Sequence, residues 1–189
     1  MTQMSIVFDL DMCVGCHSCT VACKMENNVR LGEFWSKVLQ IGPTGTFPDL
    51  ELYWLPVLCQ HCRDPQCTKV CPTGASYQRE DGVVLIDKDR CIGCQYCIVA
   101  CSYGVRYYNE EEGVVEKCTL CAHLIDRGEE PECVKTCIAK CRIFGDIDDP
   151  NSEVSKKIRE AGEENVHTLV DVGNQPSLKY ILKKHTWRS

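Results

Sequence analysis

The sequence lacks any long apolar run. None of its stretches approaches the roughly 18 to 20 residues that a helix needs to cross a bilayer, and the longest apolar segments, residues 83–86 and 98–100, have the length of single strands. Residues 1–11 contain neither the basic segment nor the apolar segment of a secretory signal. From these absences we expect no export signal and no membrane anchor in the chain itself.

Clustered positive charge and enzymatic motifs are also missing. The 21 Lys and Arg residues form no basic block, and the formal net charge is -6, which argues against nucleic acid as the main partner. The chain has no Ser/His/Asp set, no phosphate-binding loop and no dinucleotide-binding fingerprint. We therefore expect no catalytic residues and no enzyme activity in this chain on its own.

Cysteine is what the sequence has in excess, with 17 among 189 residues. The odd number excludes a complete disulfide framework, and the short, regular spacings indicate metal ligation under reducing conditions. Sixteen of the cysteines fall into four blocks of four. In chain order the blocks are Cys13, Cys16, Cys19 and Cys23; Cys59, Cys62, Cys67 and Cys71; Cys91, Cys94, Cys97 and Cys101; and Cys118, Cys121, Cys133 and Cys137.

The spacing within the blocks is typical of iron-sulfur proteins. The first and third blocks have the pattern C-x2-C-x2-C-x3-C, and residues 11–23 and 89–101 are identical at eight of thirteen positions, which indicates an internal duplication. Three close cysteines can bind three corners of a cubane cluster, while the fourth, on a short helix, reaches another cluster. Structural zinc, the competing metal, prefers two paired knuckles and has no use for a third cysteine at the same spacing. We therefore predict four [4Fe-4S] clusters.

The spacing does not decide which blocks are partners. The linkers of 19 residues after Cys71 and 16 residues after Cys101 allow either two ferredoxin modules in tandem or one module nested inside the other. The local pattern predicts strands at 5–10 and 50–58, hairpins around 80–82 and Gly113, helical turns near 20, 65, 95 and 131, and a helix at 153–161 capped by Ser152. Residues 162–189 are polar and predict either a docking arm or a loose tail.

Four segments, residues 13–27, 45–62, 64–75 and 145–155, resemble the four-cluster iron-sulfur subunits of the dimethyl sulfoxide reductase superfamily of molybdenum or tungsten enzymes. They look most like the small subunits of respiratory arsenate, polysulfide or thiosulfate reductases. The resemblance implies a subunit that relays single electrons between a donor and a molybdenum- or tungsten-bis-pterin catalytic subunit. The donor would be a quinol-oxidising membrane subunit or a soluble carrier.

The alternative function is a freestanding polyferredoxin that serves a hydrogenase or a formate dehydrogenase. An insertion and a cysteine-free C-terminal extension argue against it, because a diffusible carrier needs no docking segments. The resemblance also favours a periplasmic or other extracytoplasmic location, reached by export with a partner that has a twin-arginine signal. A cytoplasmic location is the alternative.

The resemblance implies an α+β fold of two nested bacterial-ferredoxin-like βαββαβ modules. Residues 1–30 and 105–148 would form the outer module, 50–104 the inner module, 31–49 an insertion loop rich in Gly and Pro, and 149–189 a C-terminal helix and docking arm. Each cluster would take its fourth ligand from a partner block. Counted from the catalytic subunit, the implied ligand sets are Cys13, Cys16, Cys19 and Cys137; Cys118, Cys121, Cys133 and Cys23; Cys59, Cys62, Cys67 and Cys101; and Cys91, Cys94, Cys97 and Cys71.

The seventeenth cysteine, Cys141, belongs to no set. It is expected to be a buried, inert thiol, with a substitute ligand or a redox thiol as the alternative. Lys69 and Lys135 each stand two residues after the third cysteine of their block, where they either compensate cluster charge or belong to a solvated face.

Overall fold

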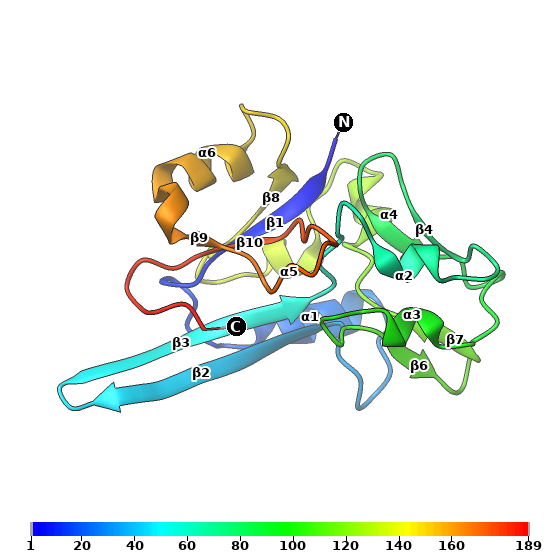
Figure 1. The fold of residues 1–189 in the computed structure, drawn as a ribbon, viewed down its shortest axis with the longest axis horizontal. Helices are drawn as coiled ribbons and strands as arrows, with labels where there is room; N and C mark the ends of the chain where they lie inside the picture. Colours follow the sequence, from blue (N-terminus) through cyan, green and yellow to red (C-terminus); the bar gives the residue numbers. More distant parts are fainter. Residues whose placement is uncertain (1, 189) are drawn as a thin grey trace.

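A four-stranded sheet built from the two ends of the chain lies at the centre of the fold (Figure 1). In this computed structural model, which describes residues 2–188, β1 (Met4–Asp9) pairs antiparallel with β8 (Arg142–Asp146) and parallel with β10 (Lys179–Ile181). β9 (Val166–His167) pairs antiparallel with β10, so the strand order is β8-β1-β10-β9. β1 is an apolar strand covered on both faces, as expected of a central strand.

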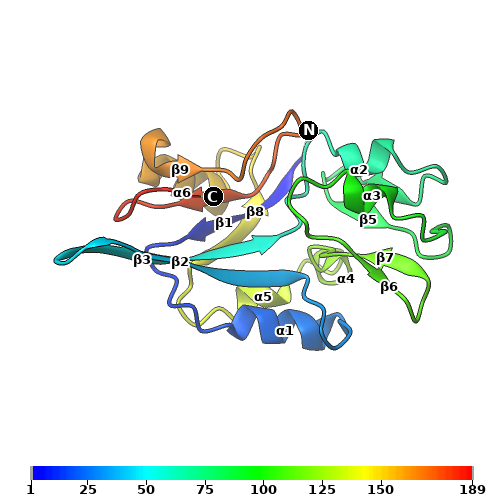
Figure 2. The same cartoon turned by 60° about the horizontal axis from the view of Figure 1, so that its bottom comes forward.

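The segment 31–49, predicted to be an insertion loop, is largely strand. β2 (Ser36–Thr46) pairs antiparallel with β3 (Asp49–Leu58) in a long hairpin, whose tip projects away from the rest of the molecule in Figures 1 and 2. The Gly and Pro residues that suggested a loop include those at the register shift between Ile41 and Thr44. A β-bulge absorbs extra residues without ending the pairing, which corrects the prediction.

Two short hairpins lie at the opposite end of the molecule from this tip (Figures 1 and 2). β4 (Ser76–Gln78) pairs with β5 (Val84–Ile86), and β6 (Tyr107–Asn109) pairs with β7 (Val114–Glu116), both antiparallel. These are the hairpins predicted around 80–82 and Gly113, and both are confirmed.

Five short helices follow the cysteine loops. They are α1 (Ser18–Glu26), α2 (Gln66–Lys69), α3 (Tyr96–Val99), α4 (Ala122–Ile125) and α5 (Glu132–Lys135). The helical turns predicted near 20, 65, 95 and 131 are therefore confirmed. Helix α1 packs against α5, and α2 packs against α3, although each pair is far apart in the sequence.

The C-terminal region is neither an arm nor a tail. Helix α6 (Glu153–Ala161) begins as predicted, with Ser152 Oγ accepting a hydrogen bond from Ser155 N at 3.1 Å. A 3-10 turn (Glu163–Asn165) and β9 follow, and β10 then inserts beside β1, where the side chain of Tyr180 is fully buried. The predicted docking arm is thus corrected: its strand β10 joins the central sheet, and its apolar residues Leu178, Tyr180, Ile181 and Leu182 are buried. Met1 and Ser189, at the outer edges of the predicted modules, lie outside the described residues.

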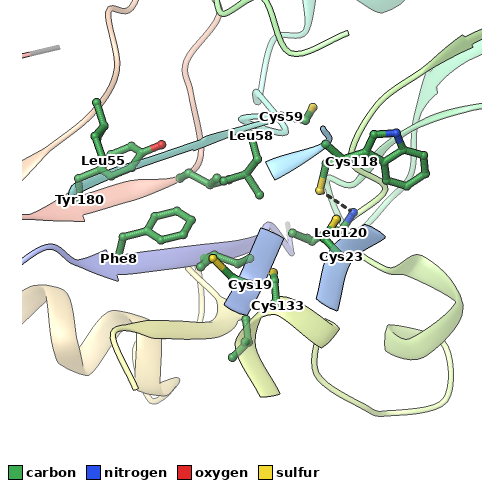
Figure 3. Close-up of a cluster of buried hydrophobic side chains, with 14 of the residues drawn as sticks. Phe8, Cys19, Cys23, Leu55, Leu58, Cys59, Cys118, Leu120, Cys133 and Tyr180 are labelled. Atoms are coloured by element: carbon green, nitrogen blue, oxygen red, sulfur yellow. Dashed lines mark hydrogen bonds between the residues drawn. The ribbon is translucent and has the colours of Figure 1, made fainter. Parts of the chain in front are cut away.

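The largest core cluster joins this sheet to the hairpin β2–β3 and to the cysteine loops. Figure 3 shows Phe8, Leu58, Leu120 and Tyr180 in it, together with thiols from several blocks. Helices and strands together make an α+β fold, which confirms the predicted class. Within residues 2–188, no helix has the length and apolar character required to span a bilayer.

Candidate iron-sulfur sites

The thiols of the four blocks line four cavities, which we name sites I to IV. Site I has about 330 Å³ and is lined by Cys13, Cys16, Cys19, Cys137 and Cys141; site II has about 280 Å³ and is lined by Cys23, Cys118, Cys121 and Cys133; site III has about 370 Å³ and is lined by Cys59, Cys62, Cys67 and Cys101; and site IV has about 310 Å³ and is lined by Cys71, Cys91, Cys94 and Cys97. The groups have the same members as the four sets implied by the resemblance, with Cys141 as an additional thiol in site I.

The thiols surround these cavities and do not converge on a point. In residues 2–188, no three His, Cys, Asp or Glu side chains are close enough together to hold one metal ion. Thiols spread over the walls of a cavity fit a group of several atoms that has separate corners to bind.

The two cysteines on or just after each of the short helices α1, α2, α3 and α5 line two different sites. On α1, Cys19 lines site I, and Cys23, one turn later, lines site II. On α5, Cys133 lines site II, and Cys137, just after the helix, lines site I. Because α1 packs against α5, sites I and II share both helices. Helices α2 and α3 repeat the arrangement, with Cys67 and Cys101 in site III and Cys71 and Cys97 in site IV.

A left-handed residue precedes the second cysteine of every block. Gly15, His61, Gly93 and Leu120 have φ of 64°, 40°, 65° and 56°. Left-handed residues in a tight loop turn successive backbone N–H groups toward the same side and create a concave site for an anion. A Cβ at Gly15 would lie 2.2 Å from the ring of Trp54, so close packing also requires glycine there.

Burial keeps several of these thiols protonated while they are uncoordinated. It raises the pKa of Cys23 to about 12, with further increases from Cys133 and Cys121. Burial also raises the pKa of Cys133 to about 11, against the opposing effect of Arg142, and that of Cys62 to about 12. Thiolates in such surroundings require a bound cation or metal to hold their charge.

Two buried arginines donate hydrogen bonds to thiols. Arg142 Nη2 lies 2.9 Å from Cys19 Sγ in site I, and Arg106 Nη2 lies 2.8 Å from Cys67 Sγ in site III. Their exposed fractions are only 4% and 5%. Burial lowers the pKa of each guanidinium, but the nearby sulfurs raise it by more, so the pKa of both rises above its ordinary value. Each arginine therefore keeps its positive charge on a cavity wall.

Lys117 is a third buried basic side chain, 2% exposed, and it contacts Cys118 of site II and Val84, which lines site III. Its Nζ donates to the carbonyl oxygen of Cys118 at 2.8 Å and to that of Val84, and burial lowers its pKa. We call Arg142, Lys117 and Arg106 the junction residues, because each interacts with thiols of two neighbouring sites. The thiols that raise the pKa of each residue are Cys19 and Cys133 for Arg142, Cys118 and Cys59 for Lys117, and Cys67 and Cys97 for Arg106.

The junction residues were not predicted from the sequence, although the repeat contains a signal for two of them. Arg106 stands five residues after Cys101, and Arg142 stands five residues after Cys137, at equivalent places in two blocks. By contrast, Lys69 and Lys135 form ion pairs with acidic residues and have side chains that are 54% and 35% exposed. They belong to a solvated face, which was the second of the two predictions for these lysines.

The sites differ in their exposure. All four cysteines of site II are buried, whereas Cys16 of site I and Cys94 of site IV are exposed. Val14 and Ile92, at equivalent positions of the duplicated blocks, lie beside them and are 60% and 66% exposed. Sites I and IV therefore reach the surface through apolar loops, while site II is enclosed.

Buried polar atoms without partners support the fit of an anionic group. Arg142 lines site I, and its Nη1 is buried with no hydrogen-bond partner among residues 2–188. His61 accepts a hydrogen bond from Val84 N at its Nδ1, at 3.0 Å, so the neutral ring has its proton on Nε2. That Nε2 is also buried and without a partner in the described part of the chain. Four thiols, an anion-binding loop and a buried donor together fit a [4Fe-4S] cluster.

Comparison with known proteins agrees with this chemistry. Residues 50–147 match the family described as a 4Fe-4S dicluster domain. The chain is 44% identical to a putative dimethyl sulfoxide reductase iron-sulfur subunit of Halobacterium salinarum, over 96% of this chain and 79% of that protein. It is 43% identical to a sulfite dehydrogenase subunit of Allochromatium vinosum, over 98% and 85%. It is 38% identical to a tetrathionate reductase subunit of Salmonella typhimurium, over 95% and 72%.

Proposed function

The chain belongs to the family of iron-sulfur electron-transfer subunits of reductase complexes, and from this premise we propose that it holds four [4Fe-4S] clusters in a linear path. The predicted family and the non-catalytic, electron-transferring role are confirmed. The relatives favour this function over the alternative of a freestanding polyferredoxin. The number of clusters, their ligands and their order are the content of the proposal.

The ligands follow from the four cavities. We assign the cysteines of sites I to IV as the four ligand sets, with Cys137 as the fourth ligand of site I. When bound, a [4Fe-4S] cluster supplies one-electron oxidation and reduction. The chain contributes the thiolates, the surrounding apolar packing and the hydrogen bonds to sulfur that set reduction potentials. One such bond joins Asn174 Nδ2 to Cys62 Sγ at 3.0 Å.

The nested arrangement of two ferredoxin modules is supported by the helix pairs. Helix α1, in the first block, packs against α5 in the fourth, while α2, in the second block, packs against α3 in the third. The strands β1 and β8 also pair across the outer module. An inner module at 50–104 inside an outer one accounts for both pairs of helices, whereas tandem modules would pair α1 with α2.

The order of the path rests on what neighbouring sites share, and this is the observation that carries the proposal. Sites I and II share helices α1 and α5, and sites III and IV share α2 and α3. Lys117 joins sites II and III, because its Nζ donates to the carbonyl oxygen of Cys118 and to that of Val84, which lines site III. These three links between four sites support a line with sites I and IV at its ends. The guanidinium groups of Arg142 and Arg106 place positive charge where an added electron increases negative charge, and so they stabilise the reduced state of the neighbouring clusters.

The exposed ends of the line indicate where electrons arrive and leave. Sites I and IV have the exposed thiols Cys16 and Cys94, each beside an exposed apolar side chain, and these loops suit contacts with partner subunits. We propose that one end faces a molybdopterin catalytic subunit, with Mo or W, and the other faces a quinol-oxidising membrane subunit or a soluble donor. The hairpin β2–β3, with Leu39, Phe47 and Leu50 exposed, offers a further docking surface.

We also propose that the complex is extracytoplasmic and exported with a twin-arginine partner, with the cytoplasm as the alternative. Fractionation of cells that produce the whole complex distinguishes the two locations.

The proposal is tested by purifying the complex without oxygen and measuring iron and acid-labile sulfide per chain. We expect four irons and four sulfides for each of four sites. Alanine substitution of one thiol per site, Cys16, Cys121, Cys62 or Cys94, should remove or alter one cluster at a time in the EPR spectrum of the reduced protein. A wild-type chain with iron for only two clusters would contradict the proposal.

A further inference from the structure

Site I contains five thiols, one more than a [4Fe-4S] cluster binds. The additional thiol is Cys141, which is 3% exposed and lines the same cavity as Cys13, Cys16, Cys19 and Cys137. Its Sγ lies 3.4 Å from Cys137 Sγ. Cys141 is thus within reach of the corner of the site that Cys137 occupies.

The other blocks have no such thiol at the equivalent position. Four residues after the fourth cysteine of a block stand Asn27, Ala75 and Val105, where the last block has Cys141. Ala75 lines site IV and Val105 lines site III, so this position faces a cavity in those blocks too. The position therefore faces the cavity in each of these blocks, and only the last block places a thiol there.

The backbone holds Cys141 firmly at this place. Asp9 N donates to the carbonyl oxygen of Cys141 at 2.8 Å, and the residue directly precedes β8. The following residue, Arg142, lines site I with a buried Nη1 that has no hydrogen-bond partner among residues 2–188. This unpartnered donor independently indicates that an anionic group belongs beside Cys141.

We propose that Cys141 is a reserve ligand that can replace Cys137 at the cluster of site I, an inference that rests on the proposed function. In the exchange, the bond between Cys137 Sγ and iron breaks and a bond between Cys141 Sγ and iron forms. The thiol proton of Cys141 passes to Cys137 across their S–H···S contact. No electron is gained or lost, so no oxidant or reductant is required.

A reserve ligand matters most at an end of the path. Site I reaches the surface through Cys16, so its cluster is open to attack, and loss of the fourth ligand there would otherwise lead to loss of iron. Site III provides the natural comparison, because its fourth ligand, Cys101, is followed four residues later by Val105.

The test compares iron content and EPR spectra of Cys137→Ala, Cys141→Ala, the double variant and Cys101→Ala, each purified without oxygen in the whole complex. Cys137→Ala and Cys141→Ala should each keep the wild-type iron content. The double variant and Cys101→Ala should each lose up to about one quarter of the iron or show the oxidised-state signal of a three-iron cluster. Equal loss from Cys137→Ala and the double variant would overturn the proposal.

Two further outcomes are also decisive. Iron loss from Cys141→Ala alone would make Cys141 the ordinary ligand and would contradict a reserve role. If Cys137→Ala fails to accumulate, Cys137→Ser is compared with Cys137→Ser plus Cys141→Ala, and equal spectra from this pair would contradict the proposal. A wild-type chain without iron at site I would instead refute the proposed function, so the two failures are distinguishable.

Discussion

Neutralising Arg106 should lower the reduction potentials at sites III and IV. Arg106 is 5% exposed, and its guanidinium donates to Cys67 Sγ at 2.8 Å and to Ser76 Oγ at 3.2 Å and interacts with Cys97 of site IV. Reduction adds one negative charge beside this cation, so the Arg106→Gln variant loses a stabilising interaction that is stronger in the reduced state.

The size of the shift follows from this contact. A hydrogen bond to a charged group contributes about 1.5–3 kcal/mol. For a one-electron couple, about 1.4 kcal/mol corresponds to 59 mV, so a bond that acts only in the reduced state is equivalent to about 60–130 mV. Because the bond also acts in the oxidised state, we expect the site III potential to fall by up to this amount. The site IV potential should fall as well, because Arg106 also interacts with Cys97.

The assay is an EPR-monitored redox titration of the complex without oxygen. Arg106→Lys, which keeps the charge, should shift the potentials less than Arg106→Gln. Lys69→Gln is the surface control, because Lys69 pairs with Asp64 on a solvated face and such pairs contribute little. Potentials that stay at the wild-type values in Arg106→Gln, or that shift as much in Lys69→Gln, would refute the reasoning.

Three further predictions concern the fold. Gly15→Ala and Gly104→Ala both place alanine in a left-handed conformation, which costs about 1–2 kcal/mol. Only a side chain at Gly15 would meet the ring of Trp54, so Gly15→Ala should also reduce the iron content at site I. Equal iron content in both variants would show that the contact is unimportant. Tyr180→Ala should lower the free energy of unfolding by about 3–5 kcal/mol, since Tyr180 is fully buried and stacks on Phe8 at 5.1 Å between ring centroids; a change below about 1 kcal/mol in denaturant titration would contradict its place in the core. Removal of iron by a chelator should unfold the chain, because cluster thiols belong to its main core; an unchanged circular dichroism spectrum after complete iron loss would be the contrary result.

Local sequence signals predicted local structure well. The cap at Ser152, the strand before the first block and both short hairpins depend on residues that are neighbours in the sequence. The prediction of a loop at 31–49 was wrong because Gly42, Pro43 and Gly45 are strong turn formers. The strand that pairs with this segment, β3, lies almost entirely outside it in the sequence.

Long-range features could not be predicted from local pattern. The residues of β10 are few and weakly periodic, and their burial depends on β1, which is more than 170 residues away along the chain. Lys117 has no repeat equivalent that marks it, so only its burial and its contacts with Cys118 and Val84 identify it. The spacing of the cysteines left the pairing of the blocks undecided. This pairing also depends on a long-range contact, the packing of α1 against α5.

The most direct test of a linear four-cluster path is anomalous scattering at the iron absorption edge from crystals of the complex grown without oxygen. Four iron clusters are expected at sites I to IV, with Arg142, Lys117 and Arg106 each between two consecutive clusters. Iron at fewer than four sites, or clusters bound by the tandem combination with Cys23 in the set of Cys59, would contradict the linear path.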